Sequence, residues 1–291
     1  MHILSRQIRF AVNPFADSTE IGANSYCAKP TANGLSLFFA LWVELTGAAN
    51  KDTGFVVNVS DIDKIIREKG IKIFDDFVKN CLVPTSAGGC LTAPVVGGCS
   101  FEQIGQLLSK VWQTIEKDFL PAKVDSLAVE LTPARKLAIK ENGGDMLYFS
   151  EKFEFSASHT LWNDKFSDSE NEKIFGKCAN KSGHGHNYIV EVTMHPVRDK
   201  ASETPDGRQG RPVSNGINAG DFERIVQQEF ISVVDHKNLN ADVEYFKKIN
   251  PTVENIAEFA FKSLADKVKP LELDCITIWE NDRTFCCYRA D

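Results

Sequence analysis

Two histidines one residue apart, His184 and His186, follow a cysteine closely in the stretch FGKCANKSGHGHNY, which spans residues 175–188. Residues at i and i+2 of a strand point to the same face, so the two imidazoles can reach one point. His159 ends the strand-like run FEFSASH, and an antiparallel neighbour would bring it alongside the pair. Three neutral imidazoles leave the fourth position of a zinc ion open, so these residues predict a catalytic zinc site. The alternative is an HxH pair on a partly exposed strand face that binds no metal.

Three further groups have side chains suited to proton transfer or to binding a polar ring. Cys178 follows Lys177, and positive neighbours lower the pKa of a thiol, which suits a base or a nucleophile; the alternative is an unreactive loop cysteine. Asp235 and His236 follow a helix-like run, where the carboxylate can orient the histidine for proton transfer, although Asp-His is also an ordinary helix C-terminus. Glu280, in the strand-like run ITIWEND, could bind a guanidine-like heterocycle through two hydrogen bonds.

These residues lie in the second of two halves that share one order of patterns. Each half has two strand-like runs, two helix-like runs and two more strand-like runs, with alternating apolar residues in 189–193 and apolar residues three and four apart in 101–115 and 256–268. The pattern predicts an α+β fold of two tandem ββααββ units, each a four-stranded antiparallel sheet with two helices on one face. The polar, Gly-containing run 140–145 predicts a junction between a domain at 1–143 and a domain at 144–291.

The first half lacks the histidines although it retains the pattern of the fold. In an alignment of the two halves, the residues opposite His159, His184 and His186 are Pro14, Leu35 and Leu37. The residues opposite Asp235, His236 and Glu280 are Asp75, Asp76 and Glu130. The contrast indicates that the histidines serve chemistry. Because Glu130 matches Glu280, a structural role remains open for both glutamates.

The bulk composition excludes several classes of protein. A chain of 291 residues with 43% hydrophobic and 25% charged residues is typical of a soluble globular protein. A net charge of −7 without clustered Lys and Arg predicts no nucleic-acid partner, and no apolar run is long enough to span a membrane. The start MHILSRQIRFAV lacks the order of a secretory signal, and the eight cysteines form no CxxC pair, so we expect a cytoplasmic protein with reduced thiols. The segment 198–216 is rich in Gly, Pro and Ser and is predicted to be a mobile loop.

Five motifs follow one another in the second half, in the order FSASH, SDSENEKIFGKCANKSGHGHNY, VVDHKNLN, PTVEN and WEND. Through these motifs, the second half resembles the 6-pyruvoyl-tetrahydropterin synthase family over roughly residues 148–291. The resemblance implies the tunnelling fold, whose ββααββ units assemble through their sheets into barrels with active sites at subunit interfaces. It also implies a reaction in which 7,8-dihydroneopterin triphosphate loses triphosphate and undergoes an internal redox rearrangement.

The resemblance also implies a role for each candidate residue. His159, His184 and His186 match the zinc ligands, and Cys178 matches the proton-abstracting cysteine. Asp235 with His236 matches the proton relay, and Glu280 matches the anchor of the pterin ring, with Thr252 and Glu254 near the same pocket.

Two alternatives remain beside this expectation. The related 6-carboxytetrahydropterin synthases of the queuosine pathway use the same substrate but release acetaldehyde, and they typically have three residues between the cysteine and the HxH pair. Five residues stand between Cys178 and His184, which favours the pyruvoyl reaction. The second alternative is a pterin- or purine-binding protein without catalysis.

The first half is expected to be inactive, because its residues opposite the ligands cannot bind zinc. We therefore expect one Zn2+ per chain, with a role for Mg2+ in triphosphate departure left open. Three tandem chains would supply six units, so the expected assembly is a homotrimer that resembles a hexamer of single units.

Overall fold

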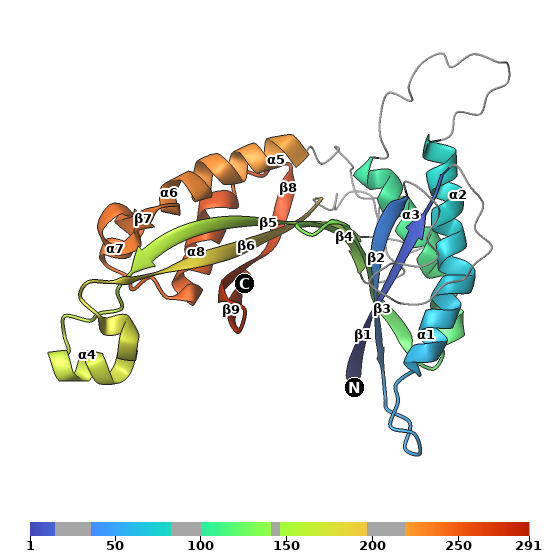
Figure 1. Ribbon diagram of the computed structural model, residues 1–291, viewed down its shortest axis with the longest axis horizontal. Helices are drawn as coiled ribbons and strands as arrows, with labels where there is room; N and C mark the ends of the chain where they lie inside the picture. The colour runs from blue at the N-terminus through green and yellow to red at the C-terminus, as the bar shows by residue number, and fades with distance from the viewer. Residues whose placement is uncertain (15–35, 83–99, 141–145, 197–218, 291) are drawn as a thin grey trace, which may run out of the picture. The chain divides into compact units, whose positions relative to one another are not determined.

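The computed structural model describes residues 1–14, 36–82, 100–140, 146–196 and 219–290 (Figure 1). The loop predicted at 198–216, Leu35 and most of the predicted junction at 140–145 lie outside these residues. The described chain forms two compact units, one up to Phe149 and one from Ser150 onward. No helix among the described residues is long and apolar enough to cross a membrane.

The first unit contains an antiparallel sheet with strand order β1-β2-β3-β4. Its strands are β1 (His2–Val12), β2 (Leu37–Gly47), β3 (Lys123–Thr132) and β4 (Arg135–Lys140). Its helices are α1 (Val59–Ile65), α2 (Ile71–Leu82) and α3 (Phe101–Ile115), with a π-helical turn η1 (Ile66–Gly70) between α1 and α2 and a 3-10 turn η2 (Glu116–Phe119) after α3. α1 and α2 contact β1, and α3 contacts β3 and β4, so the helices cover one face of the sheet (Figure 1).

The core of the first unit follows from the alternation of apolar residues along its strands. Phe10 of β1 pairs with Phe39 of β2, and the ring of Phe74 from α2 meets that of Phe10 edge-on at a centroid distance of 5.1 Å. α3 begins with a capping box in which Ser100 and Gln103 satisfy each other's backbone N–H groups. Burial of one apolar face on each element therefore fixes how helices and strands pack.

The second unit contains a sheet with strand order β5-β6-β8-β9, in which the β6–β8 and β8–β9 pairs are antiparallel. Its strands are β5 (Met146–His159), which belongs to this unit from Ser150 onward, β6 (His184–Pro196), β8 (Leu271–Asn281), β9 (Thr284–Tyr288) and the two-residue β7 (Lys237–Asn238), which runs parallel to β5. Its helices are α4 (Asp168–Phe175), α5 (Ala219–Val226), α6 (Ser232–Val234), α7 (Leu239–Asp242) and α8 (Val253–Leu264). Single turns η3 (Gly176–Ala179), η4 (Gln227–Ile231) and η5 (Glu244–Lys247) join them.

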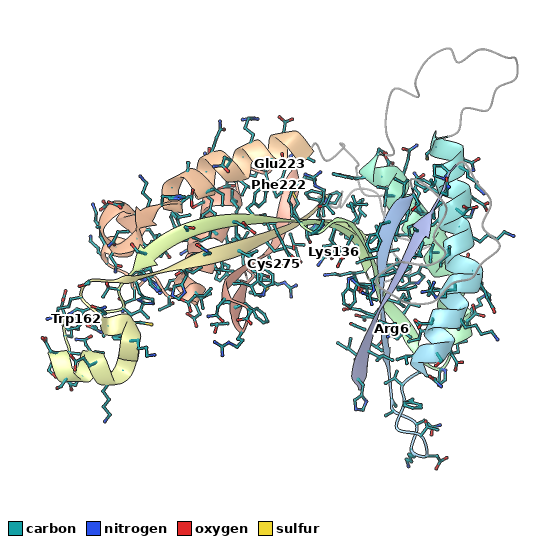
Figure 2. The ribbon with its side chains drawn as sticks, in the orientation of Figure 1. Arg6, Lys136, Trp162, Phe222, Glu223 and Cys275 are labelled. Carbon is teal, nitrogen blue, oxygen red and sulfur yellow. The ribbon has the colours of Figure 1, made fainter. Side chains whose placement is uncertain are left out.

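Aromatic side chains join β5 to the helical layer of the second unit. Phe153 meets Phe222 of α5, which is labelled in Figure 2, at a ring distance of 5.8 Å. Phe155 meets Phe230 of η4 at 5.5 Å. α8 packs on β8 and β9 through an apolar face that includes the fully buried Ile256. The predicted mixture of helices and antiparallel strands is confirmed.

One helix between β5 and β6 was not predicted. α4 begins at a capping box in which the Ser167 N–H donates to Glu170 Oε2 at 2.8 Å and Ser167 Oγ accepts from the Glu170 N–H. Asn171 is fully buried, and its amide donates to three backbone carbonyls of the preceding turn. The segment before the histidine pair is therefore an ordered structure, and the S-x-x-E pattern at 167–170 was the signal for it.

Candidate metal centre

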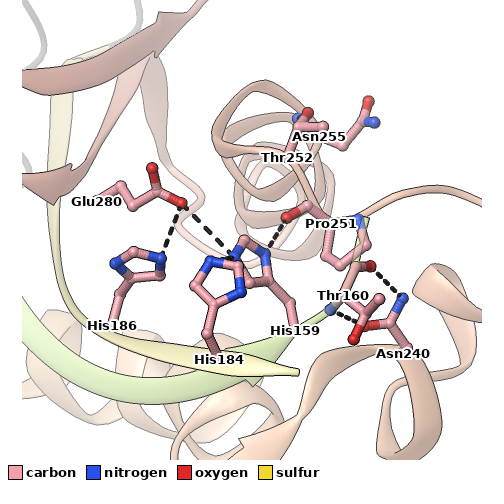
Figure 3. Close-up of polar contacts among 9 residues, drawn as sticks. All are labelled: His159, Thr160, His184, His186, Asn240, Pro251, Thr252, Asn255 and Glu280. Atoms are coloured by element: carbon pink, nitrogen blue, oxygen red, sulfur yellow. Dashed lines mark hydrogen bonds and ion pairs between the residues drawn. The ribbon is translucent and has the colours of Figure 1, made fainter. Parts of the chain in front are cut away.

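The three predicted histidine ligands come together at the ends of two strands. His159 is the last residue of β5, and His184 and His186 are the first and third residues of β6. One ligand nitrogen from each ring lies within 4.8 Å of those from the other two, and the Nε2 atoms of His159 and His184 are 3.1 Å apart (Figure 3). The structure therefore confirms the geometry that the i, i+2 spacing predicted: these histidines could hold a metal ion.

The ring nitrogens of the three histidines are suited to binding a cation. The Nδ1–H of His159 donates to the carbonyl of Pro251 at 2.7 Å, so its unprotonated Nε2 points into the cluster. Burial lowers the pKa of His159, and burial together with the neighbouring His186 lowers the pKa of His184. Both shifts favour neutral rings. His186 Nε2 is buried and has no hydrogen bond within the described residues. A metal ion among these lone pairs would remove their repulsion, and a carbonyl acceptor for the second nitrogen is the usual support for a histidine ligand.

Glycine at position 183 allows the chain to enter β6 beside His159. Its φ of +72° lies in the left-handed region, and a Cβ there would approach the carbonyl oxygen of His159 to 3.2 Å. A side chain at this position would strain the backbone and displace the end of β5. The glycine turn therefore serves the placement of the two histidine-bearing strand ends.

Glu280 of β8 lies against the histidine cluster. Its Oε1 is 3.4 Å from His186 Nε2 and 3.7 Å from His159 Nε2 (Figure 3). The carboxylate thus adds negative charge beside the place where a metal ion would bind. Its matched residue in the first unit, Glu130, instead accepts a hydrogen bond from the indole N–H of Trp42 at 2.7 Å.

Asp235 and His236 form the predicted pair where the helical run of α5, η4 and α6 ends. Asp235 Oδ2 lies 2.8 Å from His236 Nδ1, and its Oδ1 accepts the N–H of Ser156 at 2.8 Å. The bond from Ser156, followed by that from His236, lowers the pKa of Asp235. His236 adopts a left-handed backbone with φ of 57°, and its side chain is 82% exposed. The pair is attached to β5 three residues before His159.

Cys178 lies in the 3-10 turn η3, and one expectation about it is wrong. The neighbouring Lys177 was expected to lower the pKa of the thiol, but burial and the negative charge of Glu280 raise it. The carbonyl of Cys178 accepts the N–H of Leu161 at 2.9 Å, which attaches η3 to the residues just after His159. The desolvation of the sulfur and the nearby carboxylate outweigh an exposed lysine next to it in sequence.

Thr252 and Glu254 lie at the start of α8. Thr252 is the N-cap residue, and its hydroxyl accepts the N–H of Asn255; it directly follows Pro251, the partner of His159. Glu254 is exposed and lies near Cys286 of β9, whose pKa is raised by burial and by this carboxylate. The structure thus brings Thr252 beside the cluster, whereas Glu254, in the first turn of α8, interacts with Cys286.

Comparison with known proteins places the second half of the chain among characterised sequences. The sequence model described as 6-pyruvoyl tetrahydropterin synthase matches residues 148–291. The 6-pyruvoyl tetrahydrobiopterin synthase of Homo sapiens is 36% identical over 143 residues, which are 49% of this chain and 90% of the human protein. The synthase of Dictyostelium discoideum is 34% identical over 137 residues, 47% of this chain and 91% of that protein. A solved structure of the Caenorhabditis elegans 6-pyruvoyl tetrahydropterin synthase is 31% identical with a TM-score of 0.42, covering 50% of this chain and 96% of that one.

An antiparallel sheet with helices and a partly buried three-histidine cluster define a candidate metalloprotein. The chain belongs to the 6-pyruvoyl tetrahydropterin synthase family, as its matched residues and relatives show.

Proposed function

We propose that this protein converts 7,8-dihydroneopterin triphosphate into 6-pyruvoyl-tetrahydropterin with release of triphosphate, using zinc bound by His159, His184 and His186. The observation that carries the proposal is the convergence of the three imidazoles at the ends of β5 and β6. Relatives that match 90% or more of their own length bear the name of this synthase, and five residues separate Cys178 from His184.

The neutral histidines would supply the three ligands, and Pro251 would hold His159 in the tautomer that presents Nε2. Zinc bound there would act as a Lewis acid on a hydroxyl of the substrate side chain and favour ionised thiols nearby. A carboxylate beside the cluster, Glu280, would bind the amino and ring N–H groups of the pterin through charge-assisted hydrogen bonds.

Proton transfer is assigned to two groups that are both attached to the end of β5. Cys178 would take a proton from a side-chain carbon of the substrate, and His236 would return one to a neighbouring carbon. Asp235 would keep the His236 imidazole oriented through its 2.8 Å contact with Nδ1. The exposed ring of His236 is free to meet a substrate or a neighbouring subunit.

We further propose that the two units are tandem tunnelling-fold units and that three chains form a ring of six. The two units share the order of their main strands and helices, with α4, β7 and α7 as additions in the second. β1 and β9 are outer strands of their sheets and offer backbone groups for pairing. The first unit carries Leu37 and Asp76 at positions opposite His186 and His236, so it would complete the ring without catalysis.

The experiment that tests the proposed reaction is product identification. Purified protein, with its metal content measured, is incubated with 7,8-dihydroneopterin triphosphate, and the products are separated. Triphosphate with 6-pyruvoyl-tetrahydropterin is the expected result. Release of acetaldehyde with a 6-carboxy pterin would show that the product is the carboxy compound and not the pyruvoyl one. A zinc-loaded protein that binds the substrate without consuming it would refute catalysis.

A further inference from the structure

The three residues after His159 leave the strand ladder, and their backbone is held by three separate segments. The N–H groups of residues 160–162 donate to acceptors from the start of α7, from η3 and from the turn before α8. These bonds are Thr160 N to Asn240 Oδ1 at 2.8 Å, Leu161 N to the Cys178 carbonyl at 2.9 Å, and Trp162 N to Asn250 Oδ1 at 3.0 Å. A candidate metal ligand is thus followed at once by a short segment whose position other parts of the unit determine.

Asn240 contributes more than one bond to this segment. While its Oδ1 accepts the N–H of Thr160, its Nδ2 donates to the Thr160 carbonyl at 2.9 Å (Figure 3). The amide therefore exchanges both hydrogen bonds with one residue, as the opposite residue of a hydrogen-bonded pair in an antiparallel ladder does. It extends the pairing of β5 by one position beyond His159.

The backbone that carries Asn240 is itself paired with β5. The N–H of His236 donates to the carbonyl of Ser156 at 2.6 Å, and Lys237 and Asn238 pair in parallel with Ala157 and Ser158. Asn238 then caps α7, because its side chain accepts the N–H of Ala241. Residues 235–240 thus run alongside 156–160 and join the Asp235–His236 pair to the end of the ligand-bearing strand.

We propose that Asn240 is a positioning residue for His159, acting through the backbone of Thr160 to set where the His159 imidazole lies in the metal cluster. This inference rests on the proposed role of the three histidines as metal ligands. The restraints nearest to His159 are the ring bond to Pro251 and the two bonds between Asn240 and the backbone of Thr160. Without Asn240 the strand end would retain the ring bond and the more distant backbone bonds at Leu161 and Trp162, but the residue next to the ligand would lose its restraint, so the ligand would move relative to His184.

The test uses cobalt(II) added to the full-length, metal-free protein, because the visible spectrum of Co2+ reports the arrangement of its ligands. Asn240→Ala is expected to weaken Co2+ binding about tenfold and to change the position and intensity of the visible bands, the effect of losing a support one step from a ligand. Asn240→Asp keeps the acceptor for Thr160 N–H but places a carboxylate oxygen against the Thr160 carbonyl. It is expected to shift affinity and spectrum in the same direction, and it carries the test if the alanine variant does not fold.

Asn238→Ala is the matched control, since it removes a helix cap from the same segment and costs stability there without touching Thr160. It is expected to leave the Co2+ affinity and spectrum unchanged. Wild-type values in a folded Asn240 variant, or equal changes in the Asn238 variant, would overturn the inference. A wild-type protein that binds no Co2+ would instead overturn the proposed metal site, so the two failures are distinguishable.

Discussion

Replacing single histidines of the cluster should separate their contribution to folding from their contribution to metal binding. His159 is 1% exposed and donates a ring hydrogen bond to Pro251, whereas the side chain of His186 is 23% exposed and its Nε2 makes no hydrogen bond within the described residues. His159→Ala therefore leaves a buried carbonyl without its donor, which costs about 1–3 kcal/mol, and also opens a cavity. His186→Ala removes a partly exposed ring at a cost of about 1 kcal/mol or less.

The assay is urea unfolding followed by circular dichroism, first in a chelator and then with zinc. In the chelator, the free energy of unfolding of the second unit should fall by about 3 kcal/mol for His159→Ala and by about 1 kcal/mol for His186→Ala. With free zinc at 100 times its dissociation constant, the wild-type protein should gain about 2.7 kcal/mol. Both variants should gain much less, because each lacks one ligand.

Two results would refute this reasoning at different points. Equal losses for the two variants in the chelator would mean that burial and the Pro251 bond do not make His159 a structural residue. A wild-type protein whose unfolding is unaffected by zinc would mean that the cluster is not a zinc site. A gain from zinc that persists in both variants would place the metal elsewhere in the chain.

Three further changes test the remaining side chains. Cys178→Ala should retain bound metal and the wild-type unfolding curve, but its turnover should fall by at least about 100-fold. Cys286→Ala is the matched thiol control, and turnover retained in Cys178→Ala would exclude Cys178 as the base. Glu280→Gln should lower turnover about 10- to 100-fold, whereas Glu130→Gln at the matching position of the first unit should not, and equal effects of the two would contradict the binding role. The pKa of Asp235 is lowered in the folded protein, so the stability it contributes is complete above its unfolded pKa of about 4 and is lost as the pH falls through the folded value. In a chelator, the difference in unfolding free energy between wild type and Asp235→Asn should therefore be constant above about pH 5 and shrink in acid, and a difference that grows in acid would contradict this sign.

The strands and helices that bury one apolar face could be predicted from the sequence, because their apolar residues recur with periods of two or 3.6 residues. The helix at α3 and the strand start at His184 were predicted for this reason and are confirmed. α4 was missed because its residues are mostly polar and exposed, and what holds it is the capping box at Ser167 and the buried amide of Asn171. Such an element depends on particular hydrogen bonds, which leave little periodic signal.

The histidine cluster was predictable because two ligands share one strand face and the third ends a neighbouring strand. The partners that orient it were not, since Pro251 and Asn240 lie about 80–90 positions away from His159 in sequence. Pro251 uses its backbone carbonyl, and the amide of Asn240 binds the backbone of Thr160, and any residue type supplies such backbone groups. The pKa of Cys178 was predicted in the wrong direction for a related reason. A neighbouring lysine is visible in the sequence, while the burial of the sulfur and the approach of Glu280 exist only in the folded chain.

The two units differ in where an aligned helix ends, and this difference determines whether the chain can reach the strand that carries the candidate metal ligand. In the first unit, α2 continues past Asp75, which pairs with Lys79 one helical turn later. In the second unit, the helical run ends at the aligned Asp235, whose carboxylate leaves the helix and accepts the N–H of Ser156 instead. Because that ending lets the chain turn alongside β5, it brings His236 and Asn240 to the strand that ends in His159. Introducing histidines alone into the first unit would therefore not reproduce this arrangement, since α2 continues past Asp75 and the chain does not make this turn.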